Sequence, residues 1–145
     1  MNYWNLAIIV TLSVIGAAAL ILIIGKVVLT SQFNSEVKEL FSQSKDISDR
    51  IFDSSQIADL PEPVQRYFKH VLKDGRPYIS YVRLRHDGQF KSGLDKDWAN
   101  IEGEQYFTTE KPGFVWKGSI LGGTARDMYL SDKGRLVVTV LSLLP

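Results

Sequence analysis

The stretch KPGFVWKGSILGGTARDMYLSDKGRLVVTV, residues 111–140, decides the fold of this chain. Its runs of Val, Ile, Tyr, Phe and Thr favour β-strands, and they are separated by Gly122-Gly123 and Asp132-Lys133-Gly134, which favour tight turns. Strands that follow one another through short turns usually pair as antiparallel neighbours. The stretch therefore predicts the C-terminal part of an antiparallel β-meander.

The same pattern extends upstream to Tyr78 and predicts a turn at Asp87-Gly88. The expected strands are 78–86, 89–92, 101–109, 114–121, 125–131 and 135–143. Apolar residues occur on both faces of these strands, so we expect two covers for the sheet. The fold class is thus α+β, with a curved antiparallel meander that resembles a half-barrel.

Two amphipathic helices are expected before the meander. Residues 63–73 place apolar side chains on one face and begin at Pro63, so this helix is predicted to cover the sheet and to bury Phe68. Residues 31–57 show a four-three alternation of apolar residues. That pattern predicts a helical linker that packs on the domain or on a membrane surface, and the alternative is a helix that pairs with a second copy.

The N-terminal segment Leu6–Ile24, LAIIVTLSVIGAAALILII, has no charge and spans about 28 Å as a helix at ~1.5 Å per residue, close to the thickness of a bilayer core. Tyr3, Trp4 and Lys26 flank it as interface anchors. A cleavable signal peptide is the alternative, but the segment lacks a basic start and its alanines lie in the middle. We expect a single-pass anchor in the cell membrane.

Charge and composition exclude several classes of function. The formal net charge is +1 at pH 7, so nothing in the charge balance indicates a nucleic-acid partner. The chain has no cysteine, which excludes disulfides and thiolate metal sites, and its only histidines, His70 and His86, predict neither a metal site nor a cofactor. Lys26 and Lys38 lie after the apolar segment and favour a cytoplasmic domain.

Three segments carry a resemblance to a known family: LPEPVQRYFKHVL at 60–72, EKPGFVWKGSI at 110–120 and RDMYLSDKGRLVVTVLSLLP at 126–145. They resemble an uncharacterised family of bacterial membrane-anchored proteins that share a domain of unknown function. The resemblance implies no activity and no catalytic residue. Because such proteins continue past the segment similar to LSLLP, it also implies that this chain is the N-terminal portion of a longer domain and that its meander is incomplete at the C-terminus.

The expected organisation is therefore an anchor at 1–30, an amphipathic linker at 31–57 and an α+β domain of unknown function at 58–145. The aromatic and apolar excess on the strands favours a non-enzymatic binding module for an apolar or lipid-like ligand. The candidate ligand-binding residues are Phe107, Phe114, Trp116, Arg126 and Met128. Arg126 shares a strand face with Met128 and Leu130. The favoured interpretation is an arginine at the surface or on an edge strand, and the alternative is that its charge is paired or binds an anion.

Two other functions are compatible with the residues. One is a membrane-tethered enzyme that uses Asp127 and Arg126 with His86, and the other is a scaffold that dimerises through helix 31–57. A further expectation concerns residues 135–144, RLVVTVLSLL, which carry only Arg135 as a charge. An apolar edge strand of this kind favours self-association.

Overall fold

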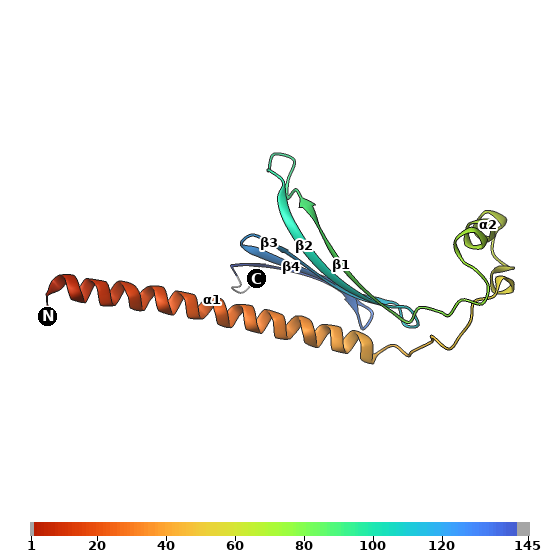
Figure 1. The fold of residues 1–145 in the computed structure, drawn as a ribbon, viewed down its shortest axis with the longest axis horizontal. Helices are drawn as coiled ribbons and strands as arrows, with labels where there is room; N and C mark the ends of the chain where they lie inside the picture. Colours follow the sequence, from red (N-terminus) through yellow and green to blue (C-terminus); the bar gives the residue numbers. More distant parts are fainter. Residues whose placement is uncertain (1, 142–145) are drawn as a thin grey trace.

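The computed structural model describes residues 2–141 and shows a long N-terminal helix, a short helical segment and a five-stranded sheet (Figure 1). The helices are α1 (Tyr3–Ser42), the 3-10 helix η1 (Ser54–Ile57) and α2 (Glu62–Val71). The strands are β1 (Tyr81–Phe90), β2 (Ala99–Thr108), β3 (Gly113–Ile120), β4 (Gly123–Leu130) and β5 (Lys133–Val140). The class is α+β, as the sequence predicts.

Helix α1 runs without interruption for 40 residues. Its N-terminal part contains the apolar segment 6–24, which is long and apolar enough to cross a membrane and has no buried residue. The predicted extension of this helix to residue 57 is wrong, since α1 ends at Ser42. Polar side chains after this point form other bonds: the Asp46 carboxylate accepts from the Ser48 amide at 2.9 Å and from the Ser80 hydroxyl. Such local bonds give the backbone an alternative to the helix.

The sheet is an open antiparallel meander with the strand order β1-β2-β3-β4-β5. The predicted turn at Asp87-Gly88 is wrong, because β1 continues through it and Gly88 pairs with Ile101 of β2. Ten consecutive residue pairs join β1 to β2, and this long ladder outweighs the local turn preference of one Asp-Gly pair. Residues 142–145 of the predicted last strand lie outside the described part of the chain.

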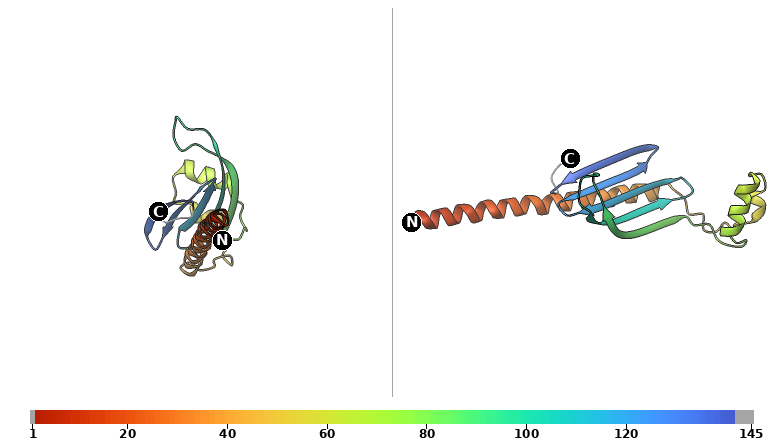
Figure 2. Two further views of the ribbon diagram at one scale, coloured as in Figure 1. Left: turned by 90° about the vertical axis from the view of Figure 1, so that its left-hand side faces the viewer. Right: turned by 90° about the horizontal axis from the view of Figure 1, so that it is seen from above.

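The two faces of the sheet differ in what covers them, because side chains alternate along each strand. The C-terminal part of α1 lies across one face, which we call the helix-side face (Figure 2). Phe33 and Leu40 of α1 pack there with Val115 and Met128, and all four are almost fully buried. This cluster is the centre of the core, so the helix that covers the sheet is α1.

The opposite face, which we call the open face, is covered by no other segment among residues 2–141 (Figures 1 and 2). It carries mainly apolar and aromatic side chains, and those of the outer strands are the most exposed. The exposed fractions are 45% for Leu84, 65% for Leu136, 55% for Val138 and 62% for Val140. Helix α1 therefore covers the more polar face of the sheet, and the more apolar face is exposed.

The prediction that helix 63–73 covers the sheet, with Phe68 in the core, is wrong. Helix α2 contains no buried residue and packs with η1 in a small lobe beyond the end of the sheet (Figure 1). The lobe is joined to β1 by extended chain, in which the Phe52 amide donates to the Arg76 carbonyl and the Tyr78 amide donates to the Arg50 carbonyl. The apolar face of α2 thus packs within the lobe and not on the sheet.

The two ends of the sheet lie at different levels along α1. At the far end, the β2–β3 and β4–β5 turns lie beside Leu40 and Gln43. At the other end, the β3–β4 turn and Leu141 lie beside Leu22, Ile23 and Lys26. We call the latter the anchor-side end, because Leu22 and Ile23 belong to the last turn of the apolar segment.

Candidate functional site

Aromatic side chains gather on the open face over the middle strands. Phe107 of β2 and Phe114 of β3 are direct partners across the two strands, with ring centroids 6.4 Å apart. Trp116 follows on the same face of β3, and its indole Nε1–H donates to His86 Nε2 of β1 at 3.0 Å. The two rings of this last pair are nearly parallel, at 5°.

Two glycines beneath these rings keep the aromatic side chains low against the sheet. A Cβ atom at Gly103 would lie 2.1 Å from the His86 ring, and one at Gly118 would lie 2.3 Å from the Trp116 ring. Neither distance is compatible with the present ring positions. Glycine inside a strand often marks such a close approach. The His86 and Trp116 rings therefore lie close to the sheet, and the Phe107 and Phe114 rings beside them are tilted by 46° to each other. We call these four residues the aromatic platform, and the aliphatic residues of the outer strands flank it.

The structure separates the five candidate ligand-binding residues into two groups. Phe107, Phe114 and Trp116 are brought together on the open face, where each is half-buried. Arg126 and Met128 lie on the helix-side face, with exposed fractions of 5% and 2%. They therefore belong to the contact between the sheet and α1, whereas the three aromatic residues remain accessible from outside.

The charge of Arg126 is held under α1. Its Nη1 donates to Glu36 Oε2 at 2.8 Å, and its Nη2 donates to Gln32 Oε1 at 3.0 Å. Arg135 of β5 donates to the other oxygen of Glu36. The favoured interpretation of Arg126 as a surface or edge-strand arginine is wrong, because β4 is an inner strand and the side chain is buried. Its partners come from the helix, about ninety residues earlier in the chain.

The three residues of the alternative enzyme hypothesis do not converge. His86 of β1 and Asp127 of β4 lie on the open face, on opposite sides of Trp116. Arg126 points to the other face. Within residues 2–141, no group of three or more His, Asp and Glu residues is arranged to hold a metal ion.

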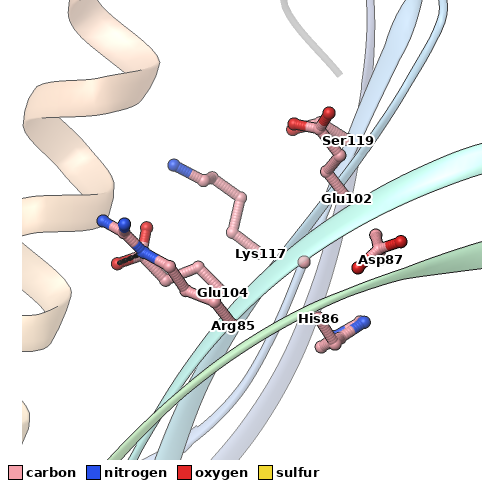
Figure 3. Close-up of a pocket in the computed structure, with 8 residues that line it drawn as sticks. Arg85, His86, Asp87, Glu102, Glu104, Lys117 and Ser119 are labelled. Carbon is pink, nitrogen blue, oxygen red and sulfur yellow. Dashed lines mark ion pairs between the residues drawn. The ribbon is translucent and has the colours of Figure 1, made fainter.

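A polar region, separate from the aromatic platform, lies on β1, β2 and β3 near the anchor-side end, in a cavity of about 650 Å³ (Figure 3). Glu104 is its centre: Arg83 Nε donates to Glu104 Oε1 at 2.9 Å, and the Tyr106 hydroxyl donates to the same oxygen at 2.6 Å. Arg85 lies 3.7 Å from it. The Tyr106 hydrogen bond, followed by that of Arg83, holds the pKa of Glu104 below its usual value despite partial burial.

The contacts around Glu104 pair its charge with those of Arg83 and Arg85. Burial, and then the Glu104 carboxylate, raise the pKa of Tyr106 above its ordinary value, so the phenol stays a donor. The group therefore ties β1 to β2 near α1, and its geometry fits a structural ion network better than a substrate site.

Sequence reasoning misses the partners of Arg126 and the pairing of His86 with Trp116. Glu36 and Gln32 belong to a segment that is predicted as a helical linker, and no local sequence pattern indicates that they contact β4. A signal for the platform is nevertheless present, because Gly103 and Gly118 interrupt strands otherwise rich in larger residues.

Comparisons with known proteins give one match. A model of the family described as "Family of unknown function (DUF6544)" matches residues 50–145, which include α2 and the whole sheet. No curated protein and no solved structure matches the chain.

Proposed function

The chain belongs to the family of unknown function DUF6544, and on that premise we propose that it is a membrane-anchored module whose open sheet face binds an acyl chain of a membrane lipid. The observation that carries the proposal is the aromatic platform on an uncovered apolar face. In this proposal residues 6–24 cross the cell membrane, the sheet lies on the cytoplasmic side, and the protein binds lipid without converting it.

The composition of the open face supports an apolar ligand. A contiguous apolar surface of this kind usually marks a binding site for a ligand, a membrane or a partner. The half-buried rings of Phe107, Phe114 and Trp116 provide flat contact area, and the aliphatic side chains of Leu84 and Leu136 extend it toward both edges. Aromatic and aliphatic contact of this kind suits a hydrocarbon chain, which needs no hydrogen-bond partner.

The position of the sheet supports a lipid as that ligand. The anchor-side end lies beside the last turn of the apolar segment, so a chain anchored through residues 6–24 holds the sheet next to the bilayer surface. Lipid is then the most abundant apolar molecule within reach of the open face. The scaffold alternative has less support, because the sheet already covers Phe33 and Leu40 of the helical stripe.

Replacement of Phe114 by Ala tests the proposal. The variant is expected to retain a phospholipid about tenfold more weakly than the wild type, because it loses part of the apolar contact area. The measurement is native mass spectrometry of the full chain, delipidated in detergent and then offered dioleoylphosphatidylcholine.

The matched control is Phe68→Ala, which makes the same chemical change in α2, away from the sheet. Both variants keep the apolar segment, so lipid held by that segment forms a common background. Equal retention by Phe114→Ala and Phe68→Ala would contradict binding at the open face.

A further inference from the structure

A cavity of about 500 Å³ lies between α1 and the β3–β4 hairpin at the anchor-side end. It lies mainly on the helix side of the sheet, because Lys117 and Arg126 point toward the helix, while Ile120 at its edge belongs to the open face. Its helix side is formed by Leu22, Ile23, Lys26, Leu29 and Thr30. The cavity is thus the junction between the apolar segment and the sheet.

The level of this cavity along α1 corresponds to the surface of a bilayer. Leu22 and Ile23 are in the last turn of the apolar segment, and Lys26 is the first charge after it. Lipid phosphates lie just outside the hydrocarbon core, at the level where lysine side chains extend. Leu121, at the tip of the β3–β4 turn, is fully exposed beside this junction and is placed to contact the same layer.

The polar groups around the cavity are suited to an anion. Lys26 and Lys117 contribute two positive charges, and Ser119 and Thr124 add hydroxyl groups. Arg126 also lines the cavity, with its charge paired to Glu36. None of the described lining residues is acidic. The nearest carboxylate across the strands from Lys117, that of Glu104, is bound by Arg83 and Tyr106.

Arg126 adds a second, independent observation. Its two terminal nitrogens bind Glu36 and Gln32, but its Nε is buried and has no hydrogen-bond partner among residues 2–141. A buried donor without a partner is uncommon in folded proteins and indicates that a water molecule, an ion or a ligand group supplies the acceptor. Phosphate oxygens are strong acceptors for guanidinium and ammonium groups.

We propose that this cavity binds the phosphate group of an anionic membrane phospholipid. Lys26 and Lys117 bind the phosphate from the two walls, and Arg126, whose buried Nε has no partner among residues 2–141, lies at the base. Leu22, Ile23 and Leu29 contact the beginning of the lipid's acyl chains. The inference rests on the membrane anchor of the proposed function, but it is independent of binding at the open face.

The test uses the full chain in nanodiscs that contain equal amounts of phosphatidylglycerol and phosphatidylcholine. When the wild type is released from these nanodiscs in native mass spectrometry, the lipids that stay bound to it are expected to be enriched in phosphatidylglycerol. Lys117→Gln is expected to lower this enrichment about tenfold, because one charge-assisted contact is lost. Lys117→Arg retains the charge and is expected to keep the enrichment, which separates the role of the charge from a folding defect.

The matched control is Lys133→Gln, which removes the same charge from the far end of the sheet and is expected to leave the enrichment unchanged. Equal enrichment by the wild type and Lys117→Gln would overturn the phosphate site. Binding of inorganic phosphate by the detergent-solubilised chain as tightly as phosphatidylglycerol would overturn the assignment to a lipid. If Phe114→Ala retains phospholipid as well as Phe68→Ala does while the enrichment of phosphatidylglycerol is intact, only the open-face proposal is contradicted.

Discussion

Glu36→Ala is expected to lower the free energy of unfolding of the sheet by about 3–5 kcal/mol. The reason is that Glu36 is the shared carboxylate of Arg126 and Arg135, and its exposed fraction is only 9%. Without it, the Arg126 guanidinium stays beneath α1 as a buried charge whose remaining helix partner is the neutral side chain of Gln32. Removal of one partner of a buried ion pair is costly because the desolvated charge remains.

The measurement is denaturant unfolding of the full chain in detergent micelles, followed by the β-sheet signal in circular dichroism. Glu39→Ala serves as the control, since Glu39 is an exposed acidic residue of the same helix whose contacts with Ser131 and Gln43 are at the surface. The control is expected to change the unfolding free energy by less than about 1 kcal/mol. A similarly small change for Glu36→Ala would mean that the sheet is not held against α1 by this pair.

Val14→Asp is expected to disfavour membrane insertion of the N-terminal segment by about 2.5–3.5 kcal/mol. Val14 lies near the middle of the uncharged segment 6–24, where an ionised carboxylate would face hydrocarbon. The measurement is the fraction of the protein that resists extraction from membranes by alkaline carbonate, together with glycosylation mapping of inserted chains.

Val14→Leu is the control for this experiment, because it keeps the segment apolar and is expected to insert like the wild type. Insertion of Val14→Asp to the same extent as Val14→Leu would contradict the placement of residue 14 in the hydrocarbon core. Release of the wild type itself into the soluble fraction would contradict the anchor.

Much of the fold follows from periodicity in the sequence. The strands from Gly113 onward are predicted within a few residues, because tight turns separate them and each strand pairs with its sequence neighbour. The apolar segment is equally clear, since nineteen uncharged residues produce a strong signal without any tertiary context. These are features that short stretches of chain determine by themselves.

The errors concern tertiary choices. The stripe of 31–42 and that of 63–73 are both compatible with a cover for the sheet, and periodicity does not decide between them. The ion pair between Glu36 and Arg126 favours α1, but its two members are distant in the sequence. Arg126 and Met128 are correctly assigned to one strand face, because side chains alternate along a strand. Their separation from Phe114 and Trp116 follows from the register between β3 and β4, which the local sequence does not specify.

The central claim is that a lipid chain contacts the open face outside the bilayer, and quenching of Trp116 fluorescence by brominated acyl chains tests it most directly. Lys117, the neighbour of Trp116, lies over the ring of Phe33, nine residues after Ile24 and so about 14 Å farther along the helix axis. The indole itself lies over Gly118, nearer the anchor-side end. Comparison with Phe114→Ala therefore separates lipid bound at the open face from hydrocarbon of the bilayer.

The experiment uses the full chain with Trp4→Phe and Trp98→Phe, which leaves Trp116 as its single tryptophan, in vesicles of brominated phosphatidylcholine. A second chain that retains only Trp4, at the start of the apolar segment, verifies reconstitution. We expect quenching of Trp116 in the first chain and a smaller effect when Phe114→Ala is added. Unchanged Trp116 emission in vesicles that quench Trp4 would contradict lipid binding at the open face.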